Sequence, residues 1–203
     1  MINKYSVIVF DLGNVLLPFS YDATINNLNK KSPGLGDHFV RYYKENREVL
    51  RIYERGGMSD KEFLNNILSG LDNKISKEEF VQYFSKVFTV NERLVSLLPE
   101  LKEKYTLLLL SNTNSIHREY GWKNYEFLKY FDKLILSYEV KAVKPELKIY
   151  KSAESFTHKT PQEHIFIDDI AEYVEGAKTA GWDAVQYTKY EQLIADFKER
   201  NIL

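Results

Sequence analysis

The chain has 203 residues, of which 44% are hydrophobic and 28% are charged, as in a globular domain with a sizeable core. Its formal net charge of −1 predicts no nucleic-acid partner, and the absence of cysteine excludes disulfides, thiol catalysis and thiolate metal sites. Because no stretch reaches the roughly 18 apolar residues that span a bilayer, and no signal peptide opens the chain, we expect no membrane partner and a cytoplasmic location.

Five short apolar runs have the composition of buried β-strands. They cover residues 7–10, 105–110, 133–136, 164–167 and 183–187. Between the later runs, apolar residues recur at intervals of three and four, as they do on one face of a helix. Because strands alternate with helices, the sequence predicts an α/β fold, a three-layer Rossmann-like core in which helices cover both faces of a parallel sheet.

The segment 18–91 contains no strand-like run. Its periodicity predicts helices over 23–30, 37–55, 60–68 and 77–88. Capping-box sequences, Ser59 with Glu62 and Ser76 with Glu79, mark the starts of the last two helices. We therefore predict a core domain made of 1–17 and 92–203, and an all-helical cap made of 18–91. This cap is inserted after the first strand, where it is placed to cover the end of that strand.

Polar residues stand at the predicted carboxyl ends of strands and before one helix. These residues are Asp11, Ser111 with Asn112, Lys144 before Pro145, and Asp168 with Asp169. In a doubly wound sheet such positions converge on one crevice. Clustered carboxylates repel one another, and oxygen ligands without a thiolate favour Mg²⁺ as the cation that resolves this repulsion.

A phosphate group fits the same crevice. The Ser111 hydroxyl and the backbone N–H groups beside it are suited to phosphate oxygens, and Lys144 adds a positive charge for the same group. Asp11 is then free to attack phosphorus as a carboxylate nucleophile. The sequence therefore predicts chemistry on a phosphorylated compound.

These features resemble the motifs of the haloacid dehalogenase-like (HAD) hydrolase superfamily, and the resemblance covers nearly the whole chain. The matching stretches, in order, are 11–15 (Asp-Leu-Gly-Asn-Val), 110–113 (Leu-Ser-Asn-Thr), 144–145 (Lys-Pro) and 166–169 (Phe-Ile-Asp-Asp). The helical insertion resembles the cap of this family. The resemblance implies an Mg²⁺-dependent phosphatase that forms an aspartyl-phosphate on Asp11.

The resemblance also implies a role for each matched residue. Asp11 is the expected nucleophile and a metal ligand, together with the backbone carbonyl of Gly13 and the carboxylate of Asp169. Asp168 is expected to bind the metal through water or to pair with Lys144. The residues implied for holding the phosphoryl group are Ser111, Asn112 through its backbone N–H, and Lys144.

The chain departs from the family pattern at two positions. Most phosphatases of the family have an Asp at the position of Gly13, where it protonates the leaving oxygen and later activates water. A branch with the Asp-x-Gly-Asn-Val form includes bacterial phosphatases of sugar 1-phosphates, whose anomeric leaving group is more acidic than an ordinary alcohol. Another residue could also supply the proton; His117 is the first candidate and His38 the weaker one. Tyr173 stands where the family has Asn or Asp near the metal.

The function predicted from the sequence is hydrolysis of a small phosphorylated metabolite, with a sugar phosphate as the first expectation, by a monomer or weak homodimer. A first alternative is a phosphate-ligand binding module that lost turnover with the carboxylate absent at Gly13. A second is a metal-independent 2-haloacid dehalogenase, which the pair Asp168–Asp169 disfavours because that reaction needs no cation. A phosphosugar mutase is the least favoured alternative, since it needs the absent carboxylate twice in each turnover.

Overall fold

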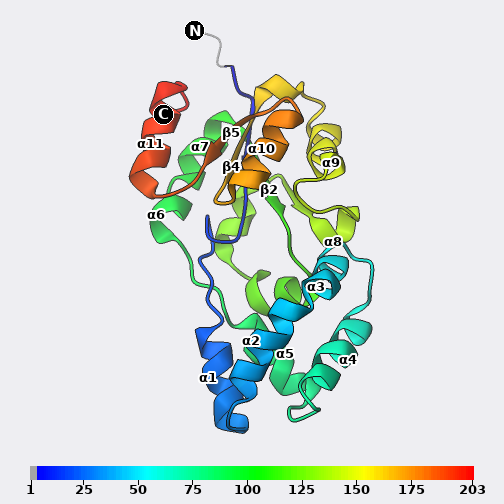
Figure 1. Ribbon diagram of the computed structural model, residues 1–203. Helices are drawn as coiled ribbons and strands as arrows, with labels where there is room; N and C mark the ends of the chain where they lie inside the picture. The colour runs from blue at the N-terminus through cyan, green and yellow to red at the C-terminus, as the bar shows by residue number, and fades with distance from the viewer. Residues whose placement is uncertain (1–3) are drawn as a thin grey trace.

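A five-stranded parallel sheet forms the centre of the computed structural model, which describes residues 4–203 (Figure 1). In the order β3-β2-β1-β4-β5 its strands are β3 (Lys133–Leu136), β2 (Thr106–Ser111), β1 (Val7–Phe10), β4 (His164–Asp168) and β5 (Asp183–Gln186). The predicted α/β fold and all five predicted strands are confirmed. Two strands extend one residue further than predicted, so that Ser111 and Asp168 are themselves the last residues of β2 and β4.

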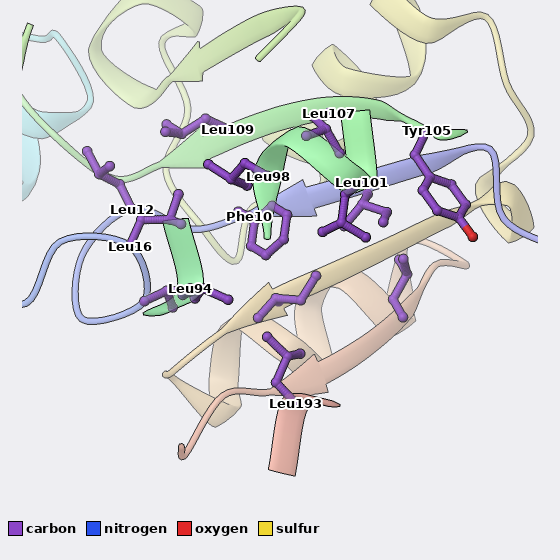
Figure 2. Close-up of a cluster of buried hydrophobic side chains, with 14 of the residues drawn as sticks. Phe10, Leu12, Leu16, Leu94, Leu98, Leu101, Tyr105, Leu107, Leu109 and Leu193 are labelled. Atoms are coloured by element: carbon purple, nitrogen blue, oxygen red, sulfur yellow. The ribbon is translucent and has the colours of Figure 1, made fainter. Parts of the chain in front are cut away.

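Helices cover both faces of the sheet because successive strand side chains alternate between the two faces. On one face, Phe10 and Leu109 pack against leucines of α6 (Glu92–Val95), α7 (Leu98–Lys104) and α11 (Tyr190–Glu199) (Figure 2). On the other face, Val9 and Leu108 pack against α9 (Leu147–Thr157) and α10 (Ala171–Thr179). These four strand residues are fully buried, and each such side chain stabilises the fold by about 1.5–3 kcal/mol relative to exposure.

Short segments complete the core. They are the α-helical turn α8 (Ser137–Val140), the π-helical segment η1 (His117–Trp122) and the 3₁₀ segments η2 (Glu126–Tyr130) and η3 (Pro161–Glu163). Within residues 4–203, no helix has the length and apolar character needed to cross a membrane.

Seven helices lie between β1 and β2, and the first five of them form a body of their own at one end of the molecule (Figure 1). These five are α1 (Asp22–Lys31), α2 (Leu35–Glu45), α3 (Arg47–Glu54), α4 (Asp60–Gly70) and α5 (Lys77–Ser85). Their buried side chains, such as Phe39, Phe63 and Phe80, form a hydrophobic cluster separate from the two clusters that flank the sheet. Both expected capping boxes are present, at Ser59 and Ser76.

Two predicted helix bounds in this body were wrong. The predicted helix 37–55 is two helices separated at Asn46, whose side-chain amide donates a hydrogen bond to the carbonyl of Tyr42 (2.9 Å). Such side-chain bonds compete with the backbone pattern of a helix. The predicted helix 77–88 ends at Ser85, because the following residues pair with another segment of the chain.

That pairing joins the two linkers between the helical body and the core. The N–H of Ser20 donates to the carbonyl of Val87 (3.1 Å), and the N–H of Thr89 donates to the carbonyl of Pro18 (2.9 Å). The two linkers therefore lie side by side and run in opposite directions. We propose that the domain boundaries predicted at 18 and 91 fall at this pair of linkers, and residues 18–91 are called the cap below.

A second contact between cap and core follows α3. The carbonyl of Gly56 accepts a hydrogen bond from the Lys141 ammonium (2.7 Å), and the carbonyl of Glu54 accepts one from the Ser137 hydroxyl (2.6 Å). Gly56 has a φ of +69°, and a Cβ added there would lie 2.2 Å from the carbonyl oxygen of Tyr138. Only glycine fits this close approach of two backbone segments.

Substitution of Gly56 tests this contact. We expect Gly56→Ala to lower the free energy of unfolding by about 2–4 kcal/mol, because the positive φ and the overlap with the Tyr138 carbonyl act together. Gly34→Ala is the matched control: its φ of +81° is similar but nothing lies within 4 Å of the added carbon, so about 1–2 kcal/mol is expected. Urea denaturation measures both; equal losses would contradict the close approach.

Candidate active site

The register of the sheet brings three predicted site residues to one edge. Phe10 of β1 pairs with Leu109 of β2 and with Ile167 of β4. The next residue of β1 is Asp11, whose N–H donates to the carbonyl of Ile167 (2.9 Å), and the next residue of β4 is Asp168. Ser111 ends β2 on the other side of β1. The three side chains thus meet where the chain order of the strands reverses around β1, the switch point of the sheet.

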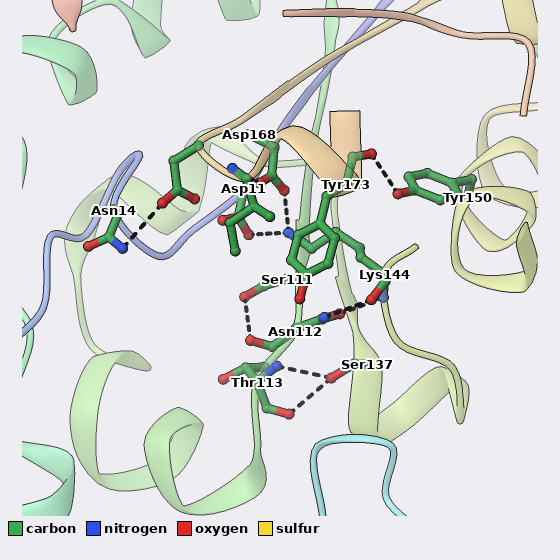
Figure 3. Close-up of polar contacts among 12 residues, drawn as sticks. Asp11, Asn14, Ser111, Asn112, Thr113, Ser137, Lys144, Tyr150, Asp168 and Tyr173 are labelled. Atoms are coloured by element: carbon green, nitrogen blue, oxygen red, sulfur yellow. Dashed lines mark hydrogen bonds and ion pairs between the residues drawn. The ribbon is translucent and has the colours of Figure 1, made fainter. Parts of the chain in front are cut away.

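Lys144 lies between two buried carboxylates at this edge (Figure 3). Its Nζ is 2.7 Å from Asp11 Oδ1 and 2.6 Å from Asp168 Oδ2, and its side chain is 1% exposed. Burial raises the pKa of Asp11 above the ordinary value, while Lys144 opposes this shift and Asp168 adds to it. Burial works against the charge of Lys144, but the two carboxylates prevail and its pKa lies above the usual value. The group is therefore a buried triad of one ammonium and two carboxyl groups.

The side chain of Asn112 fixes the backbone of Lys144. Its Oδ1 accepts a hydrogen bond from the N–H of Lys144 (2.8 Å), and its Nδ2 donates to the Lys144 carbonyl (3.2 Å). The sequence predicted a role for the backbone N–H of Asn112 and missed this one. Asn112 and Lys144 are 32 positions apart. Neither motif indicates that the Asn112 side chain bonds both the N–H and the carbonyl of Lys144.

The ring of Tyr173 faces the ammonium group of Lys144. The Lys144 ammonium lies 4.9 Å from the centre of the Tyr173 ring, within the range of a cation–π interaction. The carbonyl of Tyr173 accepts a hydrogen bond from the Tyr150 hydroxyl (2.8 Å), which holds this part of α10 against α9. The departure from Asn or Asp at this position thus gives the buried lysine an aromatic neighbour.

Three carboxylates form an acidic cluster that suits a divalent cation. Asp11, Asp168 and Asp169 each offer one oxygen, and these oxygens lie within 4.8 Å of one another. Burial and the neighbouring Asp168 raise the pKa of Asp169. Three carboxylates facing the single ammonium of Lys144 leave a surplus of negative charge, and oxygen donors are the ligands that Mg²⁺ prefers. The residues present therefore fit a magnesium ion.

The turn after β1 places Gly13 beside this cluster. Asn14 has a φ of +53°, and its Nδ2 donates to Asp169 Oδ2 (3.3 Å). Gly13 is thus held between Asp11 and a residue bonded to Asp169. Asp168 already uses one oxygen for Lys144 and the other for the N–H of Ile170 (2.8 Å). The structure shows the pairing with Lys144 that was one of the two expectations for Asp168; its contact with a metal stays a prediction.

Ser111 and the histidines have contrasting surroundings. Ser111 is buried at the same edge, and within residues 4–203 its hydroxyl makes only a long contact, with the carbonyl of Asn112 (3.4 Å). His117 packs against the ring of Phe84 at a centroid distance of 4.3 Å, and both of its nitrogens have partners: Nε2 faces the Phe84 carbonyl (3.2 Å) and Nδ1 faces the Asn114 amide (3.3 Å). Burial lowers the pKa of His117 to about 4. It joins cap to core as a neutral ring, which disfavours the predicted proton-donor role.

A cleft of about 360 Å³ opens between the cap and this edge of the sheet. Its cap side consists of Tyr43, Arg47, Glu48, Leu50, Arg51 and Glu54, and its core side of Asn112, Val143 and Tyr173. Two of the core residues, Asn112 and Tyr173, are the ones that contact Lys144. The cleft therefore borders the residues that surround Lys144, and it has the size of a small-ligand site. His38 does not line it; that side chain lies 3.8 Å from Asp72 within the cap.

The fold and the site define a class of protein. It is an α/β enzyme with a cap, in which buried carboxylates contact a lysine at the switch point of the sheet. A sequence model of the haloacid dehalogenase-like hydrolase family matches residues 5–181. The chain belongs to this family, as the motifs predicted.

Known relatives of similar length cover most of the chain. D-ribitol-5-phosphate phosphatase of Bacteroides thetaiotaomicron is 28% identical over 88% of this chain and 90% of its own length. A phosphorylated carbohydrates phosphatase of Thermotoga maritima is 25% identical over 88% of this chain and 82% of its own. A HAD family enzyme from B. thetaiotaomicron, crystallised with magnesium and inorganic phosphate, superimposes with a TM-score of 0.76 at 26% identity, covering 93% of this chain and 98% of that one.

Removal of the Lys144 charge tests the triad. We expect Lys144→Met to lower the free energy of unfolding by about 3–5 kcal/mol, because two buried carboxylates lose their partner. Without Lys144, the pKa of Asp11 in the folded protein rises further above its pKa in the unfolded chain, which is about 4. The variant therefore keeps its stability below about pH 4 and loses stability as the pH rises above that value. Urea denaturation at pH 5 and pH 8, in the presence of a chelator, measures this as a larger deficit at pH 8.

The control for this experiment is Lys141→Met. Lys141 is an exposed lysine shortly before Pro145, and its ammonium donates a hydrogen bond to the carbonyl of Gly56. We expect a loss of about 0.5–1.5 kcal/mol with no dependence on pH. A pH-independent loss in Lys144→Met as well would show that the carboxylates are not held charged by Lys144.

Proposed function

We propose that this protein is an Mg²⁺-dependent phosphatase of small phosphomonoesters, with a sugar or polyol phosphate as substrate. The observation that carries this proposal is the convergence of Asp11, Lys144 and the acidic cluster at one sheet edge, beside the Ser111 hydroxyl. Both curated relatives described above are phosphatases of phosphorylated carbohydrates or polyols, which supports the same substrate class.

In the proposed reaction, Asp11 attacks phosphorus. An Asp11–phosphorus bond forms while the bond from phosphorus to the leaving oxygen breaks, and water then attacks phosphorus and frees Asp11. Lys144 orients Asp11 through the 2.7 Å contact and places a positive charge where phosphoryl oxygens gather. Ser111, whose hydroxyl has no strong partner among residues 4–203, and the backbone N–H of Asn112 hold the phosphoryl group.

Asp11, the carbonyl of Gly13 and Asp169 would hold the Mg²⁺, with Asp168 beside them. A bound Mg²⁺ supplies positive charge that keeps Asp11 ionised and offsets the charge of the phosphoryl oxygens. The surplus of carboxylates over ammonium groups in this cluster supports that assignment.

The cleft suits the sugar or polyol part of the substrate. Its cap side offers guanidinium donors from Arg47 and Arg51 and carboxylate acceptors from Glu48 and Glu54. Hydroxyl groups both donate and accept hydrogen bonds, so a polyhydroxylated leaving group matches this mixture better than an apolar one does.

Phosphate release across a panel of esters tests the proposed function. We expect turnover that requires Mg²⁺ on ribitol 5-phosphate, ribose 5-phosphate, sugar 1-phosphates or p-nitrophenyl phosphate, and a fall to the background rate in Asp11→Asn, which has no nucleophile. Activity on 2-haloacids that survives EDTA would instead indicate the dehalogenase. Binding of phosphate esters without release on any substrate would indicate the binding module.

Mg²⁺ affinity tests the acidic cluster separately from catalysis. We expect Asp169→Asn to weaken Mg²⁺ binding by at least about tenfold, because one charged ligand oxygen is lost. Glu172→Gln, an exposed carboxylate in the first turn of α10, is the control and keeps the wild-type affinity. Calorimetric titration with MgCl₂ measures both; an unchanged affinity in Asp169→Asn would remove Asp169 from the metal site.

A further inference from the structure

The turn after β1 has no group that can protonate a leaving oxygen. Gly13 carries no side chain, and a Cβ added there would lie 3.3 Å from the ring of Phe19. The ring of Phe19, which borders the space where a side chain at position 13 would begin, packs near that of Phe88 from the other linker. The next side chain, Asn14, is directed to Asp169. A proton donor for the proposed reaction must therefore come from another segment.

Glu54 is the more buried of the two cap carboxylates, Glu48 and Glu54, that line the cleft. It is the last residue of α3, and its partly buried side chain lines the cleft together with Asn112 and Tyr173. Those two core residues are the ones that contact Lys144, so Glu54 faces the buried triad from the cap side. His117 and His38, the residues considered from the sequence, do not line this cleft.

The backbone at Glu54 is fixed by contacts that need no substrate. Its carbonyl lies 2.6 Å from the hydroxyl of Ser137, and the same hydroxyl accepts a hydrogen bond from the N–H of Thr113 (3.0 Å), just beyond β2. The following residue, Arg55, forms an ion pair with Glu146. The end of α3 is thus attached to the loop that carries Ser111 and Asn112. The backbone that carries the Glu54 side chain is therefore held beside the cleft before any ligand arrives.

The charges around Glu54 suit a group that both gives and takes a proton. Burial raises its pKa to about 7, while Arg51 of the same helix and Lys144 of the core oppose that shift. The other titratable groups close enough to interact with it are the hydroxyls of Tyr21 and Tyr43 in the cap and of Tyr173 in α10. General acid–base catalysts work best when their pKa lies near the operating pH.

We propose that Glu54 is the general acid and base of this enzyme, in place of the carboxylate that is absent at Gly13. The proposal rests on the proposed phosphatase function. As the bond from phosphorus to the leaving oxygen breaks and the Asp11–phosphorus bond forms, the carboxyl proton of Glu54 passes to the leaving oxygen. In the second step the Glu54 carboxylate takes a proton from the attacking water, the Asp11–phosphorus bond breaks, and phosphate leaves. Glu54 thereby returns to its protonated form.

The test compares two esters in single-turnover and burst experiments with Mg²⁺, using wild type, Glu54→Gln and Glu45→Gln. Ribose 5-phosphate has an alcohol leaving group that needs a proton, whereas p-nitrophenyl phosphate releases a phenolate that needs none. Glu45 is an exposed carboxylate at the end of α2 with no contact to the cleft, and its variant is expected to behave as wild type. Thermal unfolding and Mg²⁺ titration of each variant establish that the fold and the metal site are intact.

In Glu54→Gln we expect the first step on ribose 5-phosphate to slow by about 10²–10⁴-fold, while p-nitrophenol still appears in a burst of about one per enzyme followed by slow turnover. Equal slowing of the first step on both esters, a raised KM with unchanged kcat, or rates within about threefold of wild type would overturn the role of Glu54. A wild-type protein that hydrolyses p-nitrophenyl phosphate but not ribose 5-phosphate would also overturn this role, because only the second ester needs a proton donor. Absence of Mg²⁺-dependent release by wild type on either ester is a separate result that removes the proposed function itself.

Discussion

The placement of one ammonium group between two buried carboxylates is the constraint on which the rest of this structure depends. Lys144, Asp11 and Asp168 come from three separate segments, and none of these charges is tolerable in the interior without the others. The parallel register of β1 and β4 sets the two carboxylates side by side, and the Asn112 amide fixes the backbone that presents the lysine. The apolar residues of the sheet matter to function because they hold this register.

The core and the cap contribute different kinds of groups to the site. The core supplies the charged groups, buried and bonded to one another, so their geometry is set before any ligand arrives. The cap supplies a partly exposed, mixed surface of guanidinium and carboxylate groups facing the same point. Such a division suits an enzyme in which the phosphoryl group is constant and the leaving group determines the specificity.

The sequence predicted the parts of the site that lie at the ends of strands. Asp11, Ser111 and Asp168 follow apolar runs, and parallel strands place such residues together whatever the rest of the chain does. The break at Asn46 was missed because the apolar periodicity continues through it. The anchoring role of Asn112 and the position of Glu54 were missed because both depend on contacts between segments distant in the chain, which leave no local pattern.

The paired linkers have a consequence for the modular character of this protein. Since Pro18 and Thr89 are joined by a backbone hydrogen bond, the chain leaves the core for the cap and returns to it at one place, as at the base of a hairpin. The length and content of what lies beyond that base impose little entropic cost on the sheet, because loop-closure entropy grows slowly with loop length. Apart from the segment at the end of α3, which is attached to the core through Glu54 and Gly56, the residues between the linkers can therefore diversify while the catalytic sheet keeps its register.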